Sequence, residues 1–442
     1  MPLDRRSLIT ATGAAAFAIP ARAAPLSQHG LDAAHFGLHP GAPDDQSARF
    51  QRAIDEAARV RVPLALAPGV YRAGDLNLSA GAQILGVRGA TRLVLSRGQS
   101  LLAGGGDAIT LAGLTLDGQQ GGANRGLVRL SNAKDLRIAD CVIANTSADA
   151  INLEGCSGLV ENNTVESAGD NGLFALDSRG LTLRGNSIRR CGNGGVRIWQ
   201  SDKRHDGTLV TGNTIEEITS RGGGDGQNGN GINVFRAAGV IVRDNAVSAC
   251  AFSAVRGNAA SELQIVGNRC RDIGEVALYA EFEFEGAVIS ANIVDGAALG
   301  VAVTNFNRGG RLATVQSNII RNLKPKRPQG GSDSAGTGIS IEADTAVTGN
   351  VIEKASWMGI EVGAGRFLRD VAVTGNVIRE AGYGIGVSVV SGAGATSITG
   401  NLISGARLAA LAGIEWGKVT STDLARDAAR YPNLTVANNN LG

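Results

Sequence analysis

The chain has 442 residues, a formal net charge of +2 and only 4% aromatic residues. Such balanced charge excludes the strongly basic surface that nucleic-acid binding requires, so we expect no nucleic-acid partner. After residue 23 the sequence has no run of 18 uninterrupted apolar residues, so we expect no membrane span in the mature protein.

Residues 1–23 have the pattern of an export signal. A basic start and an Ala-rich apolar run precede Ala21-Arg22-Ala23, which supplies a small-x-small cleavage site. Asp4-Arg5-Arg6-Ser7-Leu8-Ile9 resembles the twin-arginine signal, which exports folded proteins. An ordinary signal peptide that happens to contain two arginines is the alternative. Both predict a periplasmic or extracellular location, and the resemblance implies the twin-arginine translocase as a partner during export.

Residues 24–95 predict an N-terminal cap followed by the first coils of a repeat structure. The acidic turn Pro43-Asp44-Asp45 precedes a helical pattern of apolar residues that includes Phe50 and Ile54. Either aspartate is well placed as the N-cap of that helix. A strand that ends in Pro68-Gly69-Val70-Tyr71 follows.

Residues 96–442 are dominated by a repeat whose clearest copies are Ala346–Ile352 and Ala372–Ile378, which are identical. From Asn163 to Asn401 the repeated Asn spans 238 residues in nine intervals, about 26 residues per interval. Apolar residues occupy the positions three before and two after each Asn. Between copies, a Gly opens a short alternating strand such as Ile339-Ser340-Ile341-Glu342. Short strands of β-branched residues between Gly, Asn and Asp turns predict an all-β solenoid, a parallel β-helix.

The repeated Asn is expected to form an internal ladder at a bend between two sheets. Successive coils stack at about 4.8 Å, so one residue type at a fixed position meets its own copies above and below. Asn tolerates left-handed backbone conformations, and its amide can hydrogen-bond to the neighbouring coils. Cys141 takes the place of this Asn upstream. We expect the five cysteines to be buried small hydrophobic residues rather than metal ligands.

The cap and the coils as far as Asn439 resemble the pectate-lyase-like right-handed β-helix proteins. With the signal, the chain resembles a twin-arginine-exported β-helix repeat protein. This resemblance implies a right-handed parallel β-helix with an N-terminal helical cap and a C-terminal cap, and it identifies no substrate. The active-site signatures of mannuronan epimerases and polygalacturonases are absent, and the calcium-binding aspartate cluster of pectate lyases is not recognisable. We therefore predict no cofactor and no metal site, although calcium is the metal that the resemblance would raise.

Outward side chains of successive coils form the floor of a groove in a solenoid. If the second residue of each such strand points outward, four consecutive coils bring eight polar and aromatic residues to one face: Arg197, Trp199, Asn233, Phe235, Arg256, Asn258, Tyr279 and Glu281. Exposed rings beside Arg and Asn suit an acidic polysaccharide, because rings stack on sugar faces, Arg pairs with uronate carboxylates and amides bind hydroxyls.

Three functional hypotheses follow. In a lyase or C5-epimerase, Arg197 or Arg256 would neutralise the uronate carboxylate, with Tyr279 or His205 as acid or base and Glu281 in the same site. The remaining groove residues would bind substrate: Trp199, Lys203, Asp225, Asn233, Phe235 and Asn258. A non-catalytic carbohydrate-binding or structural envelope protein is the second hypothesis. A glycoside hydrolase is the third, and it would need Glu281 with Glu283 or Asp225 as its two carboxyls.

Overall fold

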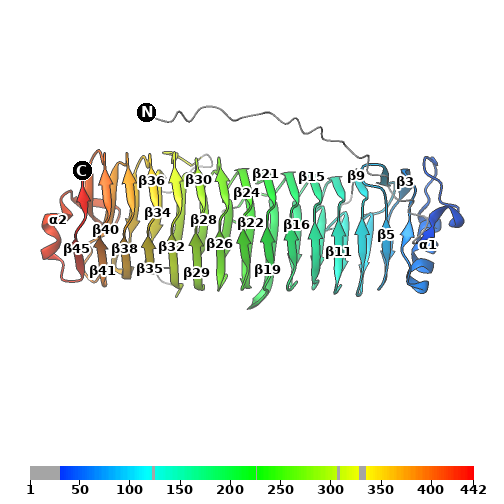
Figure 1. The fold of residues 1–442 in the computed structure, drawn as a ribbon, viewed down its shortest axis with the longest axis horizontal. Coiled ribbons are helices and arrows are strands. Elements are labelled where there is room, and N and C mark those ends of the chain that lie inside the picture. The colour runs from blue at the N-terminus through cyan, green and yellow to red at the C-terminus, as the bar shows by residue number, and fades with distance from the viewer. Residues whose placement is uncertain (1–29, 122–124, 225, 306–308, 328–334) are drawn as a thin grey trace, which may run out of the picture.

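The computed structural model describes residues 30–121, 125–224, 226–305, 309–327 and 335–442. The export signal of residues 1–23 and Asp225 lie outside the described residues. The chain winds into a long parallel β-helix whose strands lie side by side along the axis (Figure 1). Three sheets run the length of this solenoid, and each coil contributes one strand to each sheet.

Sheet A of the described chain contains, in spatial order, β1 (Leu31–Asp32), β2 (Leu64–Ala65), β5 (Gln83–Leu85), β8 (Thr110–Ala112), β11 (Leu136–Ala139), β14 (Gly158–Glu161), β17 (Thr182–Arg184), β20 (Leu209–Thr211), β23 (Ile241–Arg243), β26 (Leu263–Val266), β29 (Glu285–Ser290), β32 (Arg311–Gln316), β35 (Ala343–Thr348), β38 (Arg369–Thr374), β41 (Thr396–Thr399) and β45 (Leu434–Ala437).

Sheet B contains β3 (Gly69–Ala73), β6 (Thr91–Leu95), β9 (Thr115–Gly121), β12 (Val142–Thr146), β15 (Thr164–Ala168), β18 (Ser187–Cys191), β21 (Thr214–Ile218), β24 (Ala246–Cys250), β27 (Arg269–Arg271), β30 (Ile293–Asp295), β33 (Ile319–Arg321), β36 (Val351–Glu353), β39 (Val377–Arg379), β42 (Leu402–Ser404) and β46 (Asn440–Leu441).

Sheet C contains β4 (Leu76–Leu78), β7 (Leu102–Gly105), β10 (Val128–Ser131), β13 (Ile151–Glu154), β16 (Asn171–Leu176), β19 (Gly194–His205), β22 (Asn230–Ala238), β25 (Val255–Asn258), β28 (Val276–Glu281), β31 (Leu299–Thr304), β34 (Thr337–Ile341), β37 (Met358–Val362), β40 (Tyr383–Ser388), β43 (Ala409–Glu415) and β44 (Lys418–Ser421). The last pair, β43 and β44, is antiparallel.

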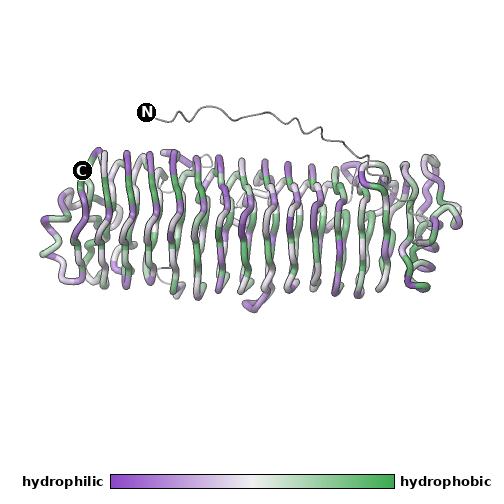
Figure 2. The backbone as a smooth tube through the Cα atoms, in the orientation of Figure 1, coloured by the Kyte–Doolittle hydropathy of each residue, from purple (hydrophilic) through white to green (hydrophobic). Residues whose placement is uncertain are grey.

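The core is built by the apolar columns of the repeat. Val347 pairs with Val373 in sheet A, and Ile352 pairs with Ile378 in sheet B. All four side chains are fully buried. Figure 2 shows hydrophobic segments returning at corresponding places in successive coils. The predicted all-β solenoid is therefore confirmed, and each coil stabilises the next by covering its apolar interior.

The Asn ladder is also confirmed, and it lies at the bend between sheets A and B. Asn163 Nδ2 donates to Asn186 Oδ1 at 3.0 Å, and the same Oδ1 accepts the backbone N–H of Asn163 at 3.0 Å. The pattern repeats coil by coil to Asn439, which accepts from Asn401 at 2.9 Å. Cys141 joins the ladder through its backbone N–H, which donates to Asn163 Oδ1 at 2.9 Å.

The left-handed backbone of this bend belongs to the residue before each ladder Asn, which corrects the expectation. Positive φ angles occur, for example, at Asn162 (55°), Gly349 (65°) and Gly375 (65°). Gly adopts this conformation without the steric cost of a Cβ. The ladder position therefore requires Asn for its amide, which both donates to and accepts from neighbouring coils.

Helices cover the two ends of the solenoid. The helix α1 (Ser47–Val60) lies at the N-terminal end, and its buried Phe50 packs edge-on against Tyr71 with ring centroids 6.0 Å apart (Figure 1). Gln46 is the N-cap and makes no side-chain cap bond, whereas Asp45 accepts from the backbone N–H of Ser47 at 3.1 Å. Asp45 thus supports the helix start from one position further out than expected.

Shorter helical segments complete the ends and one loop: η2 (Ala33–Phe36), η3 (Gly365–Phe367), α2 (Leu424–Asp427) and η4 (Ala428–Arg430). The helix α2 lies at the C-terminal end, where the resemblance implies a cap (Figure 1). All five cysteines are buried and free, as expected. Among the described residues, no helix is both long enough and apolar enough to span a bilayer.

Candidate functional site

Sheet C brings the predicted groove residues together as two aligned outward columns. The first column runs Phe174, Arg197, Asn233, Arg256 and Tyr279 across β16, β19, β22, β25 and β28. The second column, two residues further along each strand, runs Leu176, Trp199, Phe235, Asn258 and Glu281. The register follows from the period-two alternation of strands, so the sequence places these side chains correctly in space.

These side chains are more enclosed than the sequence indicates. Arg197 is 7% exposed, Arg256 8% and Glu281 1%, and Trp199 is half-buried. The segment before β22 folds over the columns, and Asn233 Nδ2 donates to the carbonyl oxygen of Gly226 at 3.3 Å. This segment therefore covers part of the outer face of sheet C, which has two hollows.

The first hollow, which we call the Arg256 pocket, has a volume of about 550 Å³. Its floor holds a buried ion pair: Arg256 Nε donates to Glu281 Oε1 at 2.7 Å. Asn258 Nδ2 donates to the same oxygen at 2.7 Å. The pocket is lined by Trp199, Gly226, Gln227, Asn233, Phe235, Arg256, Asn258, Glu275, Tyr279, Glu281 and Phe282.

Glu275 is a residue of this pocket that the sequence reasoning missed. It lies in the turn before β28, and its Oε2 is 3.9 Å from Arg256 Nη1. Arg327 Nη1 is 3.0 Å from the other carboxylate oxygen. The outward columns were built from strand residues alone, and an acidic residue in a turn is too common to be distinguished by sequence.

Burial acts on three ionisable groups of the Arg256 pocket, and the pKa of each is raised. It raises the pKa of Glu275, against the opposing charges of Arg256 and Arg327. Burial, reinforced by the charge of Glu281, raises the pKa of Tyr279 to about 12, so this phenol keeps its proton at neutral pH. Burial opposes the charge of Arg256, but the hydrogen bond and charge of Glu281 more than compensate and raise its pKa.

The second hollow, the Arg197 pocket, has a volume of about 510 Å³ and lies next along sheet C. Arg197 Nη2 donates to the carbonyl oxygen of Gln227 at 3.1 Å and to Asn228 Oδ1. Its Nε is buried without a partner, and within the described ranges Arg197 forms no ion pair. Burial lowers its pKa, although the charges of Asp170 and Asp149 act in the opposite direction.

Two carboxyls line the Arg197 pocket, Asp149 and Asp170. Asp149 Oδ1 accepts from Asn171 Nδ2 at 2.7 Å, and its Oδ2 accepts from Asn152 Nδ2 at 2.8 Å. Burial raises the pKa of Asp149 to about 6 in spite of these bonds. Asp149 is 4% exposed and Asp170 is half-buried. Both lie in turns before strands, where aspartate is common, so the sequence does not single them out.

Aromatic rings separate the two pockets. The Trp199 ring lies 5.4 Å from that of Phe174, edge-on, and 5.5 Å from that of Phe235, tilted by 59°. Trp199 Nε1 donates to Asn233 Oδ1 at 3.2 Å, and the Arg197 guanidinium lies 5.1 Å from the Trp199 ring centre. This row offers stacking surface to a ligand that spans both pockets.

Three other predicted residues, His205, Lys203 and Glu283, do not line either pocket. His205 is exposed at the end of β19. Lys203 Nζ binds Glu283 Oε2 at 2.6 Å on the exposed edge of the sheet. Glu283 is exposed, whereas Glu281 is 1% exposed, and Asp225 lies outside the described residues.

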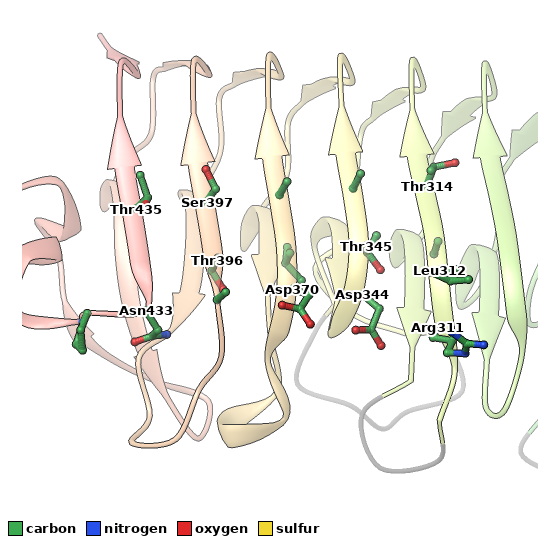
Figure 3. A pocket seen from close by; sticks show the side chains of 16 residues that line it. Arg311, Leu312, Thr314, Asp344, Thr345, Asp370, Thr396, Ser397, Asn433 and Thr435 are labelled. Atoms are coloured by element: carbon green, nitrogen blue, oxygen red, sulfur yellow. The ribbon is translucent and has the colours of Figure 1, made fainter.

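A larger hollow of about 950 Å³ lies on the outer face of sheet A and holds none of the predicted residues. Figure 3 shows Ser397 and Thr435 on the neighbouring strands β41 and β45 and Thr314 on β32, with Asp344 and Asp370 along one edge. Its floor is shallow because the column of Thr314, Ala346, Ala372, Ser397 and Thr435 is made of small residues. No aromatic side chain lines this hollow among the described residues.

No group of three or more His, Cys, Asp or Glu side chains within the described ranges is arranged to hold a metal ion.

Comparisons with known proteins identify the family. The model for the right-handed beta helix region matches residues 125–222, 150–322 and 203–369, which together span more than half of the chain. The chain belongs to the right-handed β-helix family. No curated protein sequence matches this β-helix protein.

Solved structures share the fold at low identity. The N-terminal fragment of bacteriophage phi29 gene product 12 is 14% identical, with a TM-score of 0.51 over 88% of this β-helix chain and 69% of its own. The A-module of the Azotobacter vinelandii mannuronan C-5 epimerase AlgE6 is 17% identical, with a TM-score of 0.43 over 93% and 99%. A mannuronic acid-specific polysaccharide family 6 lyase from human gut microbiota is 13% identical, with a TM-score of 0.47 over 89% and 95%. The likeness is one of fold.

Proposed function

We propose that this β-helix protein binds an acidic polysaccharide along the outer face of sheet C, from β16 to β28, and acts on it in the Arg256 pocket. We also propose, from residues 1–23, that the twin-arginine pathway exports it to the periplasm or beyond. One observation carries the binding proposal. The guanidinium of Arg197 is buried in a hollow, and it forms no ion pair with a carboxylate of the described residues.

An uronate carboxylate would complete the bonding of Arg197. The guanidinium has five N–H donors, and in this structure only Nη2 donates to protein acceptors. Its Nη1 makes no hydrogen bond to the described residues, although it is not sealed from solvent as Nε is. A charge-assisted bond to a sugar carboxylate is about twice as strong as a neutral hydrogen bond.

The surroundings of Arg197 suit the rest of a sugar. Trp199 and Phe174 offer apolar ring surface beside the guanidinium. Asp149, Asp170 and Asn152 supply oxygens that can accept hydrogen bonds from sugar hydroxyls. A chain that continues along sheet C past Trp199 and Phe235 reaches the Arg256 pocket, which is about as large.

The lyase and C5-epimerase hypotheses are the second candidate within this function. Tyr279 supports them as a general acid, because its phenol stays protonated. Arg197 and Tyr279, however, lie three coils apart, about 14 Å at the spacing of β-strands, and Arg256 is already bound to Glu281. Rising ultraviolet absorbance from an unsaturated uronate would detect elimination, and proton exchange at C5 would detect epimerisation.

Binding is tested by titrating the purified mature protein with polygalacturonate, alginate and hyaluronate, and with neutral dextran. We expect binding to at least one polyuronate and none to dextran. Arg197→Ala and Trp199→Ala should each weaken the affinity about tenfold or more, as removal of buried Arg and Trp anchors does. Trp416→Ala is the matched control, because that ring is 63% exposed and lies outside both pockets. Equal affinity for dextran, or no effect of Arg197→Ala, would refute the proposal.

A further inference from the structure

The Arg256 pocket contains two carboxyls that share one guanidinium. Glu281 Oε1 is 2.7 Å from Arg256 Nε, and Glu275 Oε2 is 3.9 Å from Arg256 Nη1. Because both nitrogens belong to one planar group, the two carboxylate oxygens lie no more than about 9 Å apart, which is below the largest carboxyl separation that inverting glycoside hydrolases use. Both carboxyls line the same pocket as the guanidinium that they share.

The two carboxyls have different surroundings. Glu281 is 1% exposed and accepts hydrogen bonds from Arg256 and Asn258. Glu275 lies in the turn at the pocket wall, where burial raises its pKa against the opposing charges of Arg256 and Arg327. Two neighbouring carboxyls with different surroundings can serve as one acid and one base of the same side-chain type.

The pocket also provides walls for a sugar ring. Trp199, Phe235 and Tyr279 line it together with both carboxyls. Tyr279 is held by the Arg256 guanidinium, which lies 5.1 Å from its ring centre. A chain bound along sheet C would therefore pass between aromatic side chains with the glycosidic bond over Arg256.

We propose that Glu275 and Glu281 are the catalytic acid and base of a glycoside hydrolase that cleaves the acidic polysaccharide bound on sheet C. The proposal rests on the binding function above and adds its reaction. Glu275 donates its proton to the glycosidic oxygen as the bond from that oxygen to the anomeric carbon breaks. A water molecule forms the new bond to the anomeric carbon and gives a proton to Glu281. One water is consumed, each product gains a hydroxyl, and proton return from Glu281 to Glu275 through solvent completes the cycle.

The first test uses the wild-type protein and the polyuronate that it binds most tightly among polygalacturonate, alginate and hyaluronate. We expect reducing ends to increase with time while ultraviolet absorbance stays flat, because hydrolysis creates no double bond. Reducing ends that rise together with absorbance would mean elimination and would overturn the assignment. Binding without any new reducing ends would also overturn it and would leave the binding function intact.

The second test compares Glu275→Gln and Glu281→Gln with Glu285→Gln. Each of the first two should lower turnover about 100-fold or more, the usual contribution of one acid or base, while affinity for the polyuronate is kept. Glu285 is a half-exposed glutamate paired with Arg311, so its variant should retain wild-type turnover. Wild-type turnover in Glu275→Gln would refute the role of this residue.

A third measurement separates catalysis from structural support. An aryl uronoside has a leaving group that needs no protonation, so Glu275→Gln should recover most of its activity on that substrate and Glu281→Gln should not. A variant that merely distorts the pocket would lose activity on both substrates alike, and that result for Glu275→Gln would overturn its assignment as the acid. If the wild-type protein bound no polyuronate at all, that result would count against the binding function instead.

Discussion

The outer face of sheet C between β16 and β28 and the outer face of sheet A between β32 and β45 follow the same coil-to-coil register, yet they carry opposite kinds of side chain. Sheet C presents Arg, Asn, Glu and aromatic rings, and an inserted segment covers them. Sheet A presents Ala, Ser and Thr on an open floor (Figure 3). Both faces are hollowed, for different physical reasons.

The hollow in sheet A exists because side chains are small, whereas the Arg256 pocket in sheet C exists because a segment of chain that includes Gly226 and Gln227 lies over large ones. Upstream in sheet A the same outward column holds Ile241, Gln264 and Val288, which would fill the space. The comparison teaches that volume alone does not mark a binding site on a solenoid. Buried charge and ring surface, which bind oriented ligands, occur at sheet C.

The largest difference between the two faces should appear when one member of an ion pair is removed. Arg256→Ala leaves Glu281 buried without its partner, so we expect a loss of about 3–5 kcal/mol of folding free energy, measured by chemical denaturation. Arg311→Ala on the sheet A face removes a half-exposed pair with Glu285, and we expect at most about 1 kcal/mol. Equal losses in the two variants would contradict the difference in burial.

The second difference is a pH dependence that belongs to sheet C. The folded-state pKa of Asp149 is about 6, above its ordinary value of 3.8, so its contribution to stability is complete below about pH 4 and is lost as the pH rises through 6. Asp149→Asn has no carboxyl at this position and does not lose stability in this way. We expect the difference in the free energy of unfolding, variant minus wild type, to rise by about 3 kcal/mol from pH 4 to pH 7.

A control for the pH experiment lies in the sheet A hollow. Asp370 is exposed there, and Asp370→Asn should change stability by less than about 0.5 kcal/mol. If the stability difference between Asp149→Asn and the wild type did not change with pH, burial of Asp149 would not be the cause of its perturbed titration.

The smallest effect is expected from adding a ring to the sheet A hollow. Ala372 is exposed on its floor, so Ala372→Trp should alter stability by no more than about 0.5 kcal/mol. We expect polyuronate affinity to stay at the wild-type value, because the new ring has no buried guanidinium beside it. A gain in affinity measured by the same titration would show that ring surface alone is sufficient, and it would contradict the importance of Arg197.

Much of the candidate site could be predicted from the sequence because strands alternate with a fixed period of two. Once the strand between successive Asn copies is located, Arg197, Asn233 and Arg256 fall into one column, and the structure shows that register. The burial of those same residues could not be predicted. It depends on the path of the segment before β22, whose length the sequence shows but whose direction it does not.

The sequence by itself determined the solenoid, its period, the apolar columns and the Asn ladder, because each coil repeats the same local interactions with its neighbours. The tertiary structure alone decided which charges meet. Glu275 reaches Arg256 from a turn in the next coil, and Arg327 approaches Glu275 from a segment 52 residues further along. Such contacts obey no periodicity, since they depend on where irregular segments cross the face of the sheet.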